Sequence, residues 1–257
     1  MASSETLDLT RHRELGELLS TSFSLFFRHS AVFLTAALMV SAPVTLIVDG
    51  IWGRALAEGA DSSPPREVTW TSTALSVIVI PLVTALIVAI VQGLGRGEQP
   101  TVGDALRAAS GRFAAAVGAV FLYAIGVAIG FIALIVPGIW LLVRWAFAAQ
   151  AAVVDGLGPV DALRRSAELV KDHWWRTLGM LLASGLLFGL IGAVITAVLT
   201  GIENGAIYVA GLIIVEAFVL SLTGIFGTLL FFDLRARHEL PWQGAGTVDP
   251  EAPERPT

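Results

Sequence analysis

The sequence predicts an all-α membrane protein with about six transmembrane helices, and two observations predict it. Apolar residues make up 55% of the 257-residue chain and charged residues only 14%, whereas soluble domains carry roughly 25% charged residues. The mean hydropathy is +0.78, and several apolar runs reach the ~20 residues that cross a bilayer. Because hydrocarbon offers the backbone no hydrogen-bond partner, continuous runs of this kind predict helices, not barrel strands.

Six apolar runs define the predicted spans. They are approximately Ala31–Trp52, Trp70–Leu94, Phe113–Val136, Ile139–Val154, Trp175–Leu199 and Ala206–Phe232. The fourth run is short and follows Pro137-Gly138, which we expect to form the outer turn between spans three and four. This span is therefore expected to be tilted, surrounded by thinned bilayer, or partly re-entrant. One membrane domain, 31–232, follows an N-terminal segment, 1–30, and precedes a tail, 233–257, whose prolines and acidic residues predict disorder.

The distribution of positive charge predicts the orientation. Thirteen of the 16 lysine and arginine residues lie in segments that share one side with the N-terminus. Arg54 and Arg66 lie on the other side, and Arg144 lies within a span. By the positive-inside rule, both termini face the cytoplasm. With Lys171 as the sole lysine and many alanines and glycines, the composition is typical of a GC-rich bacterial genome, so we expect a bacterial plasma membrane.

Three short segments predict a threefold repeat. Gly16–His29, Val102–Phe113 and Pro159–Trp175 each contain an acid–x–Leu step near their start, and each leads into a hydrophobic hairpin. In the third segment the apolar residues at helical spacing are Val160, Leu163, Ala167, Val170 and Trp174. We expect these amphipathic helices to lie in the membrane plane on the cytoplasmic side, with the apolar stripe in the acyl boundary.

The charges of the third segment leave three interpretations open. The helices can act as collars that fix the depth and tilt of the next span. Alternatively, basic residues bind anionic lipid head groups, each worth about 1 kcal/mol near the surface; the candidates are Arg164, Arg165, Lys171 and Arg176. The third interpretation is a docking surface for a cytoplasmic protein.

Charged residues inside the spans form a predicted polar cluster. Glu216 lies near the middle of the sixth span, where a charge costs at least ~2.5–3.5 kcal/mol unless it is paired or protonated. Arg144 is its expected partner, Asp49 is a competing partner for Arg144, and Gln150 and Gln92 are further candidates for the cluster. The alternatives are a buried pair that specifies packing, a substrate or ion pathway through Glu216, and a snorkelled Arg144 beside a neutral Glu216.

Two glycine motifs predict close helix approach, Gly126-x-x-x-Gly130 in span three and Gly185-x-x-x-Gly189 in span five. For both we favour packing within the chain over dimerisation.

Motifs for chemistry are missing from the sequence. Without cysteine there is no thiolate nucleophile and no cysteine-based metal site. The sequence contains no phosphate-binding loop, no HExxH and no nucleophile elbow. The histidines are expected to be solvated and are not spaced as a metal cluster: His12, His29, His173 and His238. We therefore expect no enzymatic activity and no cofactor, and the few basic residues make nucleic-acid binding unexpected.

The stretch Pro137–Gly179 resembles a known family. It is similar to the bacterial membrane-domain family named for glycerophosphoryl diester phosphodiesterases. The similar parts are the Pro-Gly pair, the run containing Arg144, Asp-Gly-Leu-Gly-Pro at 155–159, Ala-Leu-Arg-Arg-Ser at 162–166 and Trp174-Trp175. The resemblance implies about six spans preceded by amphipathic segments. Some members carry a phosphodiesterase domain with a His-Arg-Gly signature; here His12-Arg13 is followed by Glu14, so hydrolase activity is not carried over.

Two functions follow as hypotheses. The first is a non-enzymatic membrane scaffold or accessory protein whose partners are the bilayer and either anionic lipids or another membrane protein. The alternative is a lipid- or small-solute-handling transporter with a polar site around Glu216 and Arg144. A water-filled cavity at Glu216 would favour the transporter, and a dry Glu216–Arg144 pair would favour the scaffold.

Overall fold

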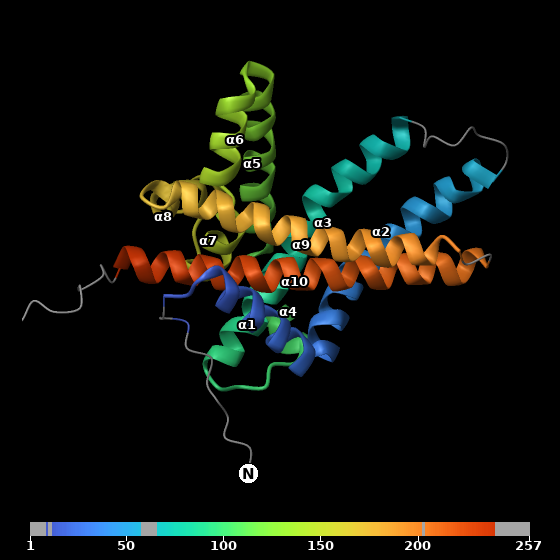
Figure 1. The fold of residues 1–257 in the computed structure, drawn as a ribbon, viewed down its shortest axis with the longest axis horizontal. Coiled ribbons are helices and arrows are strands. Elements are labelled where there is room, and N and C mark those ends of the chain that lie inside the picture. The colour runs from blue at the N-terminus through green and yellow to red at the C-terminus, as the bar shows by residue number, and fades with distance from the viewer. Residues whose placement is uncertain (1–8, 10–11, 58–65, 202–203, 240–257) are drawn as a thin grey trace, which may run out of the picture.

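The fold is all-α, as predicted, and that of a polytopic membrane protein. The computed structural model describes residues 9, 12–57, 66–201 and 204–239, and within these residues every regular secondary-structure element is a helix (Figure 1). Five helices or joined helices are long and apolar enough to cross a membrane, and a sixth span results if α1 and α2, bent by 88° at their junction, count as one.

The order of the helices confirms the predicted repeat. The described residues form α1 (Leu15–Arg28), α2 (Ser30–Ala57), α3 (Arg66–Gly95), α4 (Val102–Ser110), α5 (Phe113–Ala133), α6 (Ile135–Arg144), α7 (Ala148–Val154), α8 (Pro159–Lys171), α9 (Trp174–Leu199) and α10 (Gly205–Glu239). A short helix followed by two longer apolar helices thus occurs three times, with α7 added after α6. The α5–α6 hairpin projects crosswise to the α9–α10 pair (Figure 1).

Helix α3 forms the centre of the molecule. It contacts α2, α4, α5, α7 and α10. In the apolar window Ile78–Gly95, 72% of residues are buried, against 17% in Phe113–Ala133 of α5. A helix that is apolar on all sides suits such a central position, whereas few residues of α5 are fully buried.

The short helices pack against protein. Helix α1 lies on α10, α4 on α3, and α8 on α5 and α7. In α8, Leu163, Ala167 and Val170 are buried within the protein, whereas Val160 is exposed. The expectation that the apolar stripe of α8 lies in the acyl boundary is therefore wrong, because α5 and α7 cover that stripe.

The turn between α5 and α6 differs from the prediction. The chain reverses at Leu134, which has an extended backbone (φ −167°, ψ 156°), and not at Pro137-Gly138. Pro137 lies in the first turn of α6, where its missing N–H costs nothing. Gly138 lies against Gly130 of α5, since a Cβ on Gly130 would be 3.0 Å from the Cα of Gly138.

The predicted fourth span is a broken helix. Helix α6 ends at Arg144 and α7 begins at Ala148. The hydroxyl of Ser166, fully buried in α8, accepts a hydrogen bond from the Phe147 N–H at 3.1 Å and donates one to the Arg144 carbonyl at 3.0 Å. Ser166 thereby satisfies backbone groups that the break would otherwise leave unpaired in an apolar environment.

The two glycine motifs have different surroundings. A Cβ on Gly126 would meet the ring of Trp145, and Gly130 contacts α6, so the first motif packs within the chain as predicted. Apart from neighbouring atoms of α9 itself, no atom of the described residues would lie within 4 Å of a Cβ added to Gly185 or Gly189. Close packing of the second motif within the described part of the chain is therefore a wrong prediction, although Gly189 lines a groove between α9 and α10.

The Gly130→Ala substitution should lower the free energy of unfolding by about 1–3 kcal/mol, because the new methyl would press on the backbone of α6. Gly185→Ala is the matched control. It should leave stability unchanged or raise it by up to about 1 kcal/mol through helix propensity. Unfolding by a denaturing detergent, followed by circular dichroism, measures both; equal effects would contradict the close α5–α6 contact.

The Ser166→Ala substitution should lower the free energy of unfolding by about 1–3 kcal/mol, because it leaves two buried backbone groups without their partner. Ser20→Ala serves as the control, since the exposed Ser20 hydroxyl only donates to the Glu17 carbonyl within α1. The same unfolding measurement applies. A Ser166→Ala variant as stable as Ser20→Ala would show that the break does not need this hydroxyl.

Candidate functional site

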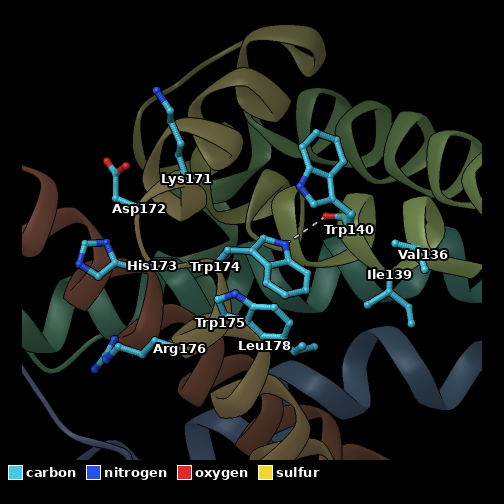
Figure 2. A pocket seen from close by; sticks show the side chains of 10 residues that line it. All are labelled: Val136, Ile139, Trp140, Lys171, Asp172, His173, Trp174, Trp175, Arg176 and Leu178. Atoms are coloured by element: carbon cyan, nitrogen blue, oxygen red, sulfur yellow. Dashed lines mark hydrogen bonds between the residues drawn. The ribbon is translucent and has the colours of Figure 1, made fainter.

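A groove lies between α6 and the beginning of α9, and we call it the Trp groove. Its volume is about 880 Å³. Three tryptophans line it, Trp140 of α6 and Trp174-Trp175 of α9, together with the aliphatic side chains of Val136, Ile139 and Leu178. The Trp174 indole N–H donates to the Trp140 carbonyl at 3.5 Å and so joins the two walls (Figure 2).

One end of the Trp groove is polar. Lys171, Asp172, His173 and Arg176 lie there, and Val136 and Ile139 lie on the opposite side (Figure 2). Lys171 and Asp172 are exposed, and neither side chain forms an ion pair with another residue that the structure describes.

Burial, together with the guanidinium groups of Arg237 and Arg176, lowers the pKa of His173. His173 is half-buried, in contrast to the solvated histidine we expected.

The Asp233 cluster comprises Asp233, Arg13, Arg176 and Arg237 and lies beside this polar end. The Asp233 carboxylate is fully buried. It accepts hydrogen bonds from the Arg13 backbone N–H at 2.6 Å, the Arg176 guanidinium at 2.7 Å and the Arg237 Nε at 3.0 Å. Arg176 also donates to the Arg13 carbonyl at 2.6 Å. The cluster therefore ties the N-terminal segment to the beginning of α9 and the end of α10.

The Asp155 cluster holds the other side of α10. The Asp155 carboxylate, in the turn between α7 and α8, pairs with Arg235 of α10 at 2.9 Å and with Arg165 of α8 at 3.4 Å. Arg235 lies two residues from Asp233. The last turns of α10 are thus fixed from two directions.

Arg112 explains the glycine in this turn. Its guanidinium donates to the Val153 carbonyl at 2.9 Å, near the end of α7. Gly156 has φ +67°, and a Cβ there would lie 2.5 Å from Arg112 Nη1. Both the left-handed backbone and the close approach of Arg112 favour glycine at this position.

The family comparison adds a classification. The chain matches, over residues 18–236, the family model described as a domain of unknown function (DUF7847). It belongs to the DUF7847 family. No curated protein matches the chain, and no solved structure does. The description of DUF7847 assigns no activity, so the function has to be inferred from the geometry of this chain.

The predicted head-group contacts of this DUF7847 chain divide into two kinds. Arg165 and Arg176 are half-buried and engaged with Asp155 and Asp233, so they fasten helices. Arg164 is exposed and, among the described residues, pairs only with Asp161, one turn away on α8, at 3.4 Å. Lys171 alone of the four lines the Trp groove without an ion pair to a described residue.

The predicted pairing of Arg144 with Glu216 is wrong. The Arg144 guanidinium lies 4.5 Å from the centre of the Trp140 ring, one turn away on α6. Glu216 accepts a hydrogen bond from the Thr45 hydroxyl of α2 at 2.8 Å. Gln150 is buried in α7, with its amide 3.1 Å from the Cβ position of Gly227 in α10.

The remaining members of the predicted polar cluster lie elsewhere. The side chain of Asp49 is outside the described residues. Gln92 is half-buried near the end of α3. Glu216 lines a separate groove of about 400 Å³, which also includes Thr45, Phe188 and Gly189. Arg144, Gln150 and Glu216 therefore do not converge on one site, because α6, α7 and α10 present them in different places.

Sequence reasoning missed Asp233, Asp155 and Trp140 as site residues. A pattern was present for Asp233, which follows the aromatic end of the last span and precedes Arg237 by one helical turn. Asp155 lies in the motif at 155–159, which entered the sequence analysis only through its resemblance to a known family. Trp140 carried no pattern, because its role depends on the position of α9.

Asp233→Asn should lower the free energy of unfolding by about 3–5 kcal/mol, because it leaves half-buried guanidinium groups without their anion. Asp161→Asn is the matched control: it removes an exposed i,i+3 pair, and the effect should stay within about 1 kcal/mol. Unfolding titrations of both variants, at one salt concentration, give the comparison. Similar small losses for the two variants would contradict a structural role for the Asp233 cluster.

Proposed function

We propose that this chain is a non-enzymatic membrane scaffold or accessory protein. The observation that carries the proposal is a contrast between two parts of the molecule. Ion pairs hold the linked ends of α8, α9 and α10, which we call the base, whereas few residues of the hairpin helices α5 and α9 are buried. Only 17% of the apolar window of α5 and 22% of that of α9 are buried within the chain. The Asp155 and Asp233 clusters meanwhile use charged residues to hold α8, α9 and α10 together. Such a base presents the outer faces of the hairpins in a fixed arrangement to lipid or to another membrane protein.

The orientation forms part of the proposal. The Asp233 cluster brings the N-terminal segment, the beginning of α9 and the end of α10 to one end of the molecule. Several arginines gather there, which supports a cytoplasmic position for this end in a bacterial plasma membrane. The kinship with the phosphodiesterase-associated membrane domains stays a prediction, and hydrolase activity is not proposed.

A second candidate is a lipid- or small-solute-handling transporter. The groove of about 400 Å³ beside Glu216 favours it, because a carboxylate exposed in an apolar helix suits a polar or cationic solute. Arg144 does not contribute, since it stacks on Trp140. Loss of uptake into proteoliposomes in a Glu216→Gln variant would favour this candidate over the scaffold.

The scaffold proposal is testable by photo-crosslinking in native membranes. A photoreactive amino acid placed at Leu186 on α9 or at Ile132 on α5 should form an adduct of defined mass with one protein, because both side chains point outward. The same amino acid at Arg164, exposed on α8, is the control for non-specific capture. Adducts with lipid alone at both hairpin positions would overturn the scaffold proposal.

A further inference from the structure

We propose that the Trp groove binds one phospholipid whose head group carries an ammonium, with the phosphate at Lys171, the ammonium at Asp172 and an acyl chain along α6. This inference goes beyond the scaffold function. It requires only the groove, and it holds whether or not the hairpins bind a partner protein.

The dimensions and lining of the groove suit an acyl chain. Its volume of about 880 Å³ lies within the ~300–1,000 Å³ typical of small-molecule sites. Val136 and Ile139 lie one helical turn apart on α6, and Leu178 faces them from α9. They provide an apolar path that leads away from the polar end of the groove (Figure 2).

The tryptophans suit the border between chain and head group. Trp174 and Trp175 pack edge to face, with ring centres 4.7 Å apart, at the start of α9. Trp175 is largely exposed although it lies beside an apolar groove. Indole rings prefer the membrane–water interface, where one edge meets hydrocarbon and the N–H meets polar groups. The three rings thus place the interface at the level of Lys171 and Asp172.

The charges at the polar end determine the class of head group. Arg176 is engaged with Asp233 and with the Arg13 carbonyl. The neighbouring Lys171 and Asp172 keep one positive and one negative charge without an ion pair to a described residue. A phosphate and an ammonium on one head group complement both charges, whereas a purely anionic head group leaves Asp172 facing like charge.

The test uses the purified full chain in detergent micelles, titrated with single lipids and observed by native mass spectrometry. Phosphatidylethanolamine should bind one molecule per chain, and at least about fivefold more tightly than phosphatidylglycerol, which lacks the ammonium, or diacylglycerol, which lacks the head group. Phosphatidylcholine should bind more weakly than phosphatidylethanolamine, because its quaternary ammonium has no N–H to donate to Asp172. Equal binding of all four lipids would overturn the proposal.

Variants locate the site. Lys171→Gln and Asp172→Asn should each weaken phosphatidylethanolamine binding about fivefold. Arg164→Gln removes one exposed positive charge from the same helix outside the groove, so its binding should equal that of the unaltered chain. Equal losses in Lys171→Gln and Arg164→Gln would show general charge attraction and contradict the assigned site.

A measurement on the unaltered chain guards against variants that fold poorly. Three of the seven tryptophans line the groove. Phosphatidylethanolamine with a brominated acyl chain should therefore quench more tryptophan fluorescence than phosphatidylglycerol with the same chain. Equal quenching by the two brominated lipids would contradict the head-group preference.

Discussion

The fully buried carboxylate of Asp233 is the interaction on which the arrangement of the helix ends depends. An ion taken out of water loses several kcal/mol of solvation, and only well-placed partners offset the loss. Here the partners come from three places: a backbone N–H of the N-terminal segment, Arg176 of α9 and Arg237 of α10. None of the three can move independently without leaving a buried charge short of a donor. The cost of burial thus becomes a constraint on which chain segments lie together.

The Asp155 cluster transmits this constraint to the middle hairpin. Arg235 connects the end of α10 to Asp155, and Arg165 connects Asp155 to α8. With α8 held in place, Ser166 bridges the break between α6 and α7. The position at which α6 leaves the base is therefore set by polar contacts, although α6 itself is apolar. The Trp groove lies between α6 and α9, so its shape depends on both clusters.

The sequence was sufficient for features that each segment determines alone. Hydrocarbon requires every span to satisfy its own backbone, so long apolar runs such as Phe113–Ala133 identify helices without knowledge of their neighbours. Features that depend on which faces meet were not accessible. Arg144 and Glu216 looked like partners because both are charged residues in apolar runs, but α6 turns Arg144 onto Trp140. Gly185 looked equivalent to Gly130, although of the two only Gly130 meets another described helix.

The basic residues of α8 and the start of α9 show how position divides similar side chains into different roles. Arg165 and Arg176 lie within reach of Asp155 and Asp233, and those carboxylates fix them as structural groups. Lys171 has no such carboxylate partner among the described residues, and its neighbour Asp172 is likewise left without a cationic one there. Both lie at the end of an apolar groove whose walls the two clusters hold in place. The charges of Lys171 and Asp172, which form no ion pair with a described residue, therefore lie at the place that the proposal assigns to the lipid head group.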